Sequence, residues 1–107
     1  MANSTEYSVV LTTTATKEDA HEIGRHLLDR KLAACVQVFT IESLYTWKGE
    51  MAHENEFMLF IKTRRDLYSE IENAIRAVHK YETPEIVQLP IIGGASSYLN
   101  WINEVTG

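Results

Sequence analysis

The chain has 107 residues, 45% of them hydrophobic and 23% charged, a composition that predicts one globular domain over residues 1–107. The formal net charge of -5 argues against nucleic acid as a partner, because a protein that binds a phosphate backbone needs a basic surface. No apolar run approaches the roughly 20 residues that span a bilayer, and residues 1–8 lack the basic and apolar regions of a signal peptide. We therefore expect no membrane association and a cytoplasmic location.

The first predicted elements are a strand at residues 7–13 and a helix that begins near Lys17. Apolar and polar side chains alternate along the strand, so that one face is more apolar than the other. The side chains of that face are Tyr7, Val9 and Leu11. Thr16 and Asp19 have the spacing of a capping box, which marks the start of the helix.

A long β-hairpin follows, with strands predicted at residues 35–47 and 51–63. Both segments are rich in β-branched and aromatic residues, and Lys48-Gly49 lies between them as the turn. At about 3.3 Å per residue such arms reach close to 40 Å, more than the domain needs to cover its helices. We therefore expect the hairpin tip to overhang. Residues 57–61 are apolar on both faces, which predicts a central strand.

The second half of the chain predicts a helix, a short strand and a final helix. Apolar residues at helical spacing define the first of these helices, which ends before Pro84. The strand is predicted at residues 85–89, stopped by Pro90, and the final helix starts at Ser96 or Ser97. The complete order of elements predicts an α+β fold of the ferredoxin-like βαββαβ type, with an extra C-terminal helix.

The overhanging hairpin predicts self-association. A two-stranded arm with a bare backbone edge is unstable alone, and closed symmetry is the usual way to cover such an edge. Tyr45 and Trp47 are the candidates for this interface, with the alternative that they cover their own sheet. Trp101 and Tyr98 are expected in the core or at an interface, with ligand stacking as the minor alternative. The residues do not decide between two and three subunits.

The junction between the second helix and the last strand carries His79, Glu82 and Glu85. In one interpretation His79 caps the helix carbonyls. In the other, a neutral His79 and a nearby carboxylate bind a borderline divalent ion such as copper or zinc. Cys35 is the only cysteine, so no intrachain disulfide forms. It is expected as a buried apolar residue or, if it faces a cleft near His79, as a soft third ligand.

Other polar residues offer weaker signals. Lys62 and Glu56 lie on one face of the third strand by their even spacing, where they pair with Tyr81 or Glu85 in a cleft or form a surface or interface salt bridge. Residues 12–16 favour helix capping over phosphate binding, since no glycine-rich loop accompanies them. No nucleophile stands beside a base at catalytic spacing, so we expect neither an enzyme nor an organic cofactor.

Three ordered motifs, KLAACV at residues 31–36, SLYTWKGE at 43–50 and VHKYETPE at 78–85, resemble the CutA (CutA1) family of divalent-cation tolerance proteins. The resemblance extends from about Tyr7 to Trp101. It implies a homotrimer, similar in architecture to the PII signalling proteins, in which the hairpins extend one another's sheets. It also implies that copper or other divalent metal ions are bound, at clefts between the subunits.

The resemblance places His79 in the family's proposed metal-ligating stretch, and the predicted metal ligands are therefore His79, Glu85 and Cys35. The residues expected to line the cleft are Tyr81, Glu82, Lys62 and Trp47. Two departures imply weak binding, because Thr12 replaces a first-strand thiol and Val78 replaces a second histidine. The alternative is a PII-like sensor of small molecules that acts on an unknown protein partner without metal.

Overall fold

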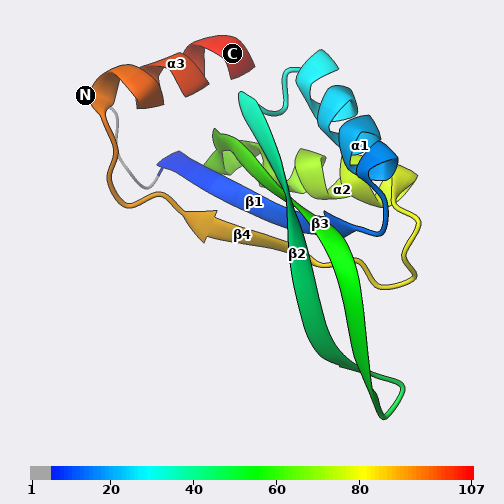
Figure 1. The fold of residues 1–107 in the computed structure, drawn as a ribbon. Helices are drawn as coiled ribbons and strands as arrows, with labels where there is room; N and C mark the ends of the chain where they lie inside the picture. Colours follow the sequence, from blue (N-terminus) through cyan, green and yellow to red (C-terminus); the bar gives the residue numbers. More distant parts are fainter. Residues whose placement is uncertain (1–5) are drawn as a thin grey trace.

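The computed structural model describes residues 6–107, which form one four-stranded antiparallel sheet and three α-helices (Figure 1). In chain order the elements are β1 (Tyr7–Thr14), α1 (Lys17–Asp29), β2 (Cys35–Trp47), β3 (Glu50–Arg64), a 3-10 turn (Arg65–Leu67), α2 (Tyr68–Val78), β4 (Ile86–Pro90) and α3 (Ser96–Thr106). This order confirms the predicted α+β, ferredoxin-like fold with a long hairpin and a C-terminal helix. No helix within residues 6–107 is long and apolar enough to cross a membrane.

Local sequence signals set the start of α1 and the turn of the hairpin. The Thr16 side chain accepts a hydrogen bond from the Asp19 backbone N–H at 3.0 Å, which confirms the predicted helix cap. Lys48 and Gly49 both have positive φ values, 51° and 83°, between the paired residues Trp47 and Glu50. Two positive φ values are typical of the tight hairpin turn whose twist matches that of the strands.

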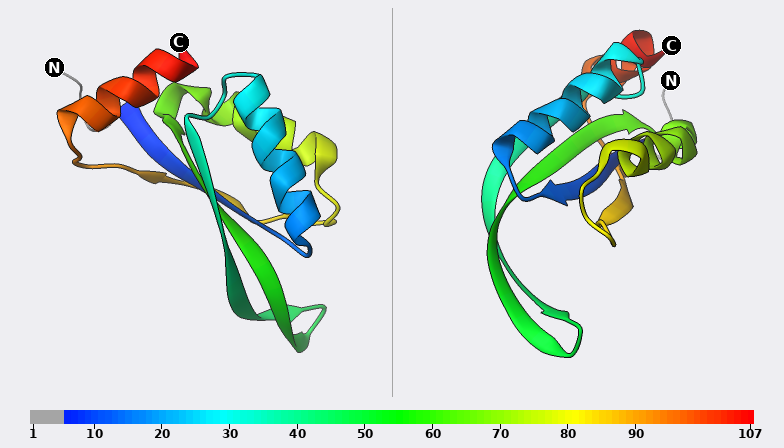
Figure 2. Two further views of the ribbon diagram at one scale, coloured as in Figure 1. Left: turned by 45° about the horizontal axis from the view of Figure 1, so that its top comes forward. Right: turned by 90° about the vertical axis from the view of Figure 1, so that its right-hand side faces the viewer.

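The hairpin extends well beyond the rest of the sheet. The strand order is β2-β3-β1-β4, and β1 pairs with β3 only along residues 57–64. The hairpin arms at residues 41–47 and 50–56 therefore pair only with each other, and the molecule measures 48 × 26 × 22 Å. Figures 1 and 2 show this arm projecting beyond the rest of the sheet, and Figure 2 shows that it is curved. The predicted overhang and the central position of residues 57–61 are both confirmed.

The main core lies between the sheet and the helices α1 and α2. Its fully buried side chains include Val10, Leu59 and Ile61 from the sheet. On β1 the alternation places Ser8, Thr12 and Thr14 on the same side as Val10, so the more polar face of this strand lies beneath the helices. Hydrogen bonds satisfy two of these hydroxyls: Ser8 donates to the Gln88 side chain at 2.7 Å and Thr14 to the Thr16 carbonyl at 2.8 Å.

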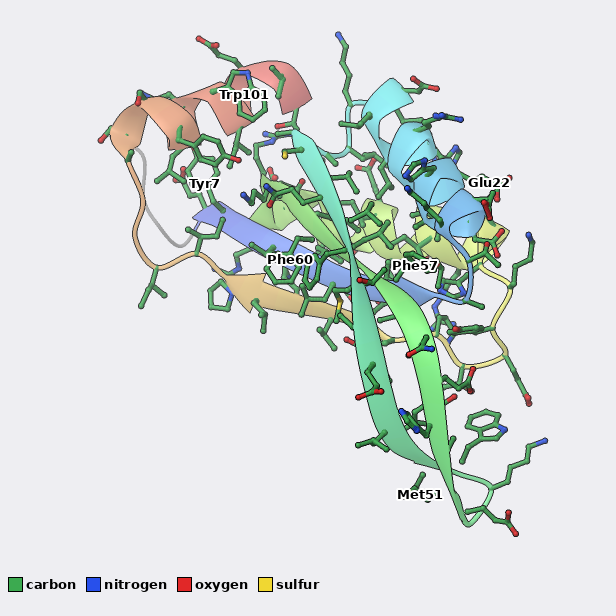
Figure 3. All side chains as sticks on the ribbon, in the orientation of Figure 1. Tyr7, Glu22, Met51, Phe57, Phe60 and Trp101 are labelled. Carbon is green, nitrogen blue, oxygen red and sulfur yellow. The ribbon has the colours of Figure 1, made fainter. Side chains whose placement is uncertain are left out.

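The opposite face of the sheet is covered by α3 at one end only. There Leu99 and Ile102 of α3 pack with Tyr7 and Ala34 in a second buried cluster, and Figure 3 shows Trp101 on the same helix. The rest of this surface, which we call the open face, is apolar. Its side chains are Val9, Leu11, Phe39, Met58, Phe60, Val87 and Leu89. Phe39, Val87 and Leu89 are 42% to 48% exposed.

Several strand boundaries differ from the sequence prediction by one residue, and the end of β4 shows why. Pro90 is the last residue of β4, opposite Ser8, and does not stop the strand before it. Proline lacks a backbone donor and is therefore tolerated on an edge strand, where one side of the backbone makes no ladder bonds. Within residues 6–107, β4 and β2 are the two edges of the sheet.

Candidate functional site

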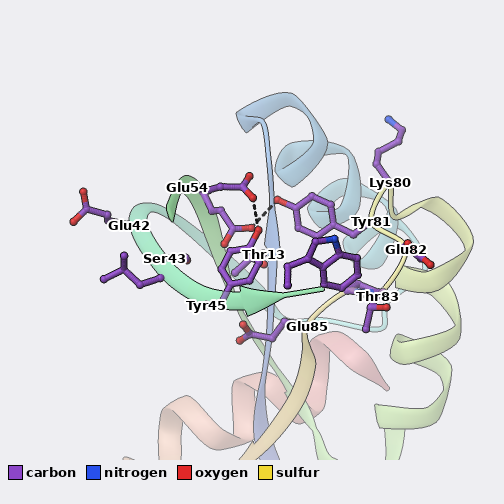
Figure 4. A pocket seen from close by; sticks show the side chains of 14 residues that line it. Thr13, Glu42, Ser43, Tyr45, Glu54, Lys80, Tyr81, Glu82, Thr83 and Glu85 are labelled. Carbon is purple, nitrogen blue, oxygen red and sulfur yellow. Dashed lines mark hydrogen bonds between the residues drawn. The ribbon is translucent and has the colours of Figure 1, made fainter. Parts of the chain in front are cut away.

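A pocket of about 830 Å³ lies between the overhanging part of the hairpin and the loop that joins α2 to β4. We call it the hairpin pocket. Its lining residues are Thr13, Glu42, Ser43, Leu44, Tyr45, Trp47, Glu54, Glu56, Lys80, Tyr81, Glu82, Thr83, Pro84 and Glu85. Figure 4 shows the hairpin side chains Tyr45 and Glu54 next to Tyr81 of the loop. The curvature of the hairpin brings these distant segments together.

Tyr81 joins the loop to the hairpin. Its hydroxyl donates a hydrogen bond of 2.6 Å to Oε2 of Glu56, a residue that is only 6% exposed. Burial, and then this hydrogen bond to a carboxylate, raise the pKa of Tyr81 well above its ordinary value of 10.0. The phenol therefore stays protonated and continues to donate to Glu56 throughout the physiological pH range.

A second phenol–carboxylate pair lies farther along the hairpin. The Tyr45 hydroxyl donates to Oε1 of Glu54 in a short hydrogen bond (Figure 4). This bond is the main cause that raises the pKa of Tyr45 to about 12. Glu54 and Glu56 are two residues apart on β3, so their side chains share one face and the two pairs lie next to each other.

His79 holds the start of the loop against β1. Its Nε2 lies 2.7 Å from the Thr13 carbonyl oxygen, and its Nδ1 accepts the backbone N–H of Tyr81 at 3.1 Å. Because Nδ1 accepts, Nε2 carries the proton that is donated to Thr13. The imidazole therefore does not cap the helix carbonyls, as one of the two sequence interpretations required. The backbone N–H of His79 makes that contact instead, with Ile75 at 2.9 Å.

Lys80 fixes the loop from the other side. Its ammonium lies 3.0 Å from Oδ1 of Asp19 in the first turn of α1. The hydrogen bond to Lys80 holds the pKa of Asp19 below its ordinary value. The loop of the hairpin pocket is thus attached to β1, β3 and α1 through His79, Tyr81 and Lys80.

The predicted metal ligands do not meet in one chain. Glu85 lines the hairpin pocket, whereas His79 is not among the lining residues and contacts the Thr13 carbonyl. Cys35 pairs with Lys62 at the end of β2 that is far from the hairpin turn. Residues 6–107 contain no cluster of three or more histidine, cysteine, aspartate or glutamate side chains able to hold a metal ion. A site built from these three residues stays a prediction that requires more than one subunit.

The predicted cleft residues are divided between two places. Tyr81, Glu82 and Trp47 line the hairpin pocket. Lys62 lies toward the other end of β3, where its ammonium is 5.4 Å from the centroid of the Tyr98 ring on α3. Its even spacing from Glu56 does place both on one face of β3, but six residues of strand separate them by about 20 Å. Of the two alternatives for these residues, the pairing in a cleft occurs for Glu56, which accepts from Tyr81. Within residues 6–107, Lys62 pairs with neither Tyr81 nor Glu85, and neither Lys62 nor Glu56 forms a salt bridge.

The predicted interface residues are exposed in a single chain. Tyr45 and Trp101 are each 38% exposed and Trp47 is 42% exposed. Trp101 packs against Tyr98 at 5.6 Å between ring centroids. The prediction that they lie between subunits is compatible with this exposure and remains a prediction.

The sequence reasoning missed the acidic residues on the hairpin arms, Glu42 and Glu54. The signal was present, because a two-residue turn at Lys48-Gly49 fixes the cross-strand register. That register pairs Tyr45 with Ala52, so that Glu54 is the diagonal neighbour of Tyr45 on the same face.

Comparison with known proteins identifies the family. Residues 8–105 match the CutA1 divalent ion tolerance protein family. The divalent-cation tolerance protein CutA of Archaeoglobus fulgidus is 37% identical over 98 residues, which cover 92% of this chain and 96% of the relative. The protein of the same name from Thermus thermophilus is 39% identical over 100 residues, with 92% and 97% covered.

Solved structures agree with the sequence relatives. The structure of the periplasmic divalent cation tolerance protein CutA from Archaeoglobus fulgidus superimposes with a TM-score of 0.93 at 36% identity, over 94% of this chain and 99% of that one. The divalent cation tolerance protein from Thermus thermophilus gives 0.91 at 38% identity, over 94% and 99% of the two chains. With the family match covering nearly the whole chain, this chain belongs to the CutA family of divalent-cation tolerance proteins.

Proposed function

We propose that this protein contributes to divalent-cation tolerance as a homotrimer that binds copper or another divalent ion weakly at the clefts between its subunits. The observation that carries the proposal is the position of the hairpin pocket. Three of its five carboxylates, those of Glu42, Glu54 and Glu56, lie on an arm whose strands pair only with each other within residues 6–107. A second copy that covers this arm therefore also approaches the carboxylates.

The exposed apolar surfaces support self-association. The open face presents Phe39, Val87 and Leu89 at more than two-fifths exposure, and the edges of β2 and β4 make no further strand pairs within the described chain. Large exposed apolar patches mark interaction sites, and strand edges favour pairing with another strand. Closed threefold packing of identical copies covers both features without forming open fibres.

The donor atoms support weak rather than tight metal binding. Glu82 and Glu85 are exposed and offer carboxylate oxygens, and His79 offers a nitrogen only if one of its two hydrogen bonds is broken. Replacing such a bond lowers the net affinity by about 1 kcal/mol. The remaining ligands must come from the neighbouring subunit, because one chain does not assemble three of them within residues 6–107.

Native mass spectrometry with a copper(II) titration tests the proposal. We expect a trimer that takes up about one ion per subunit and loses this uptake in the His79→Ala variant. The matched control is His21→Ala, which removes an exposed imidazole from α1. Equal uptake by both variants, or no uptake by the wild type, would contradict the metal part of the proposal.

A second candidate function is a small-molecule sensor that acts on a protein partner. The size of the hairpin pocket favours it, because about 830 Å³ falls in the range of pockets that hold small organic ligands. A thermal shift produced by an organic ligand, with none produced by copper(II) or zinc(II), would favour this candidate.

A further inference from the structure

We propose that the hairpin pocket binds a small organic cation, one that carries an ammonium or guanidinium group on a short carbon chain. This inference rests on the second candidate's premise that an organic molecule enters the pocket, and it does not depend on metal binding. Three independent features of the pocket carry it: its charge, its aromatic side chains and its size.

The charge of the lining is strongly negative. Five glutamates line the pocket, whereas its one basic lining residue, Lys80, is paired with Asp19 at 3.0 Å and points away from Tyr45 and Glu54 in Figure 4. Of the five, only Glu42 forms an ion pair within residues 6–107, with His53 at 3.0 Å. The other four are Glu54, Glu56, Glu82 and Glu85.

Glu56 points most directly to a cationic ligand. This residue lines the pocket and is only 6% exposed. Its carboxylate accepts a hydrogen bond from the neutral phenol of Tyr81. A buried carboxylate is normally compensated by a positive charge, because burial removes the water that stabilises it. No described cation lies within ion-pair distance of Glu56. A ligand cation supplies the missing charge.

The aromatic side chains favour an organic cation over a bare one. Tyr45, Trp47 and Tyr81 line the same pocket as the carboxylates. Ammonium and guanidinium groups are attracted to aromatic faces, most strongly to tryptophan. The Lys48 ammonium already lies 5.6 Å from the centroid of the Trp47 ring, so this indole is in contact with a cation in the free chain.

The dimensions and donor geometry separate this ligand from a metal ion and from a nucleotide. A volume of about 830 Å³ is much larger than an ion requires, and residues 6–107 assemble no group of three metal ligands. One carboxylate oxygen of Glu54 and one of Glu56 are occupied by phenols. A phosphate-bearing ligand is disfavoured, since its negative charge would meet four unpaired glutamates.

Isothermal titration of the metal-free, assembled protein with cadaverine and with agmatine tests the proposal. Pentanediol is the neutral control, because it has the same chain as cadaverine without the charge. We expect at least one of the two cations to bind at least about tenfold more tightly than the diol, and the difference to shrink at high salt. If neither cation binds more tightly than the diol, the proposal is wrong.

Variants locate the binding. Glu85→Gln removes an exposed carboxylate of the pocket and is expected to weaken binding about fivefold, and Trp47→Leu about tenfold. The matched control Glu104→Gln makes the same charge change on the exposed surface of α3 and should leave the affinity unchanged. Equal losses in Glu85→Gln and Glu104→Gln would show nonspecific attraction and overturn the proposal.

The result is distinguishable from the metal proposal. Copper(II) uptake without cation binding would overturn this inference and leave the metal proposal standing. Cation binding that is lost in Glu85→Gln, without copper uptake, would support this inference and contradict the metal proposal. Unfolding curves of each variant, measured at the same protein concentration, show whether a lost affinity reflects a lost fold.

Discussion

Removal of the Tyr81 hydroxyl is the most direct structural test of how the hairpin pocket is held together. The Tyr81→Phe change leaves the ring in place but takes the donor from Glu56, a residue that is 6% exposed. A hydrogen bond to a charged group contributes about 1.5–3 kcal/mol, and the loss leaves a buried acceptor without its donor. We therefore expect the free energy of unfolding to fall by about 2 kcal/mol.

A double-mutant cycle with Glu56→Gln isolates the contact. The glutamine keeps an acceptor oxygen but is neutral, so Tyr81→Phe in this background should lower stability by only about 1 kcal/mol. The assay is guanidinium chloride unfolding at one fixed protein concentration. Tyr98→Phe on α3 is the control, because that side chain is 38% exposed. A loss below about 0.5 kcal/mol that does not change with Glu56→Gln would refute the reasoning.

Three further predictions test other parts of the structure. The Thr12 hydroxyl is fully buried and has no hydrogen-bond partner within residues 6–107, so Thr12→Val should raise the free energy of unfolding by about 1–2 kcal/mol. A lower free energy of unfolding in denaturant would contradict this. The φ of +83° at Gly49 is unfavourable for a residue with a side chain, so Gly49→Ala should lower the free energy of unfolding by about 1 kcal/mol. The control Gly93→Ala should change it little. Equal unfolding midpoints of the two variants would contradict the turn geometry. Folding raises the pKa of Tyr45 to about 12 and also raises that of Tyr81. The stability that these two phenol–carboxylate pairs contribute is therefore complete below about pH 10, the ordinary tyrosine pKa, and is lost as the pH rises through the pKa values of the folded protein. Burial also raises the pKa of Tyr68, so ultraviolet titration should show three of the five tyrosines ionising late, and two in Tyr45→Phe. Five tyrosines that ionise together near pH 10 would exclude these pairs.

The fold was predictable from the sequence because its signals are local. Thr16 and Asp19 cap α1 as their spacing predicts, and the apolar alternation and the Lys48-Gly49 turn define the hairpin. The overhang followed from strand length alone. The orientation of β1 was harder, because Tyr7, Val9 and Leu11 suggest the core face, whereas the helices cover the face with Ser8, Thr12 and Thr14.

The site was only partly predictable because its partners are distant in sequence. The pairing of Glu56 with Tyr81 was one of the expected contacts, and the hairpin register contained the pair of Tyr45 with Glu54. The contact of His79 with the Thr13 carbonyl was not predictable, since any backbone oxygen near the loop accepts a hydrogen bond equally well. Only the three-dimensional path of β1 selects Thr13.

The predicted metal ligands could not be placed from the sequence for the same reason. Cys35 begins β2, whereas the hairpin pocket is lined by residues 42–47 of that strand, so that about 20 Å or more separates the thiol from the pocket. Sequence spacing carries no information on which strand end faces a loop of the same chain or of a neighbour. A metal site made of Cys35, His79 and Glu85 therefore stays a prediction that requires more than one subunit.

The proposed function depends most on association of the chains, since it places the metal ions at clefts between subunits. Sedimentation equilibrium of the full chain over a range of micromolar concentrations measures the mass of the assembly directly. Our account predicts three times the chain mass of 12.2 kDa across the range. A mass equal to one chain at these concentrations would contradict the trimer and remove the intersubunit clefts on which the proposed function depends.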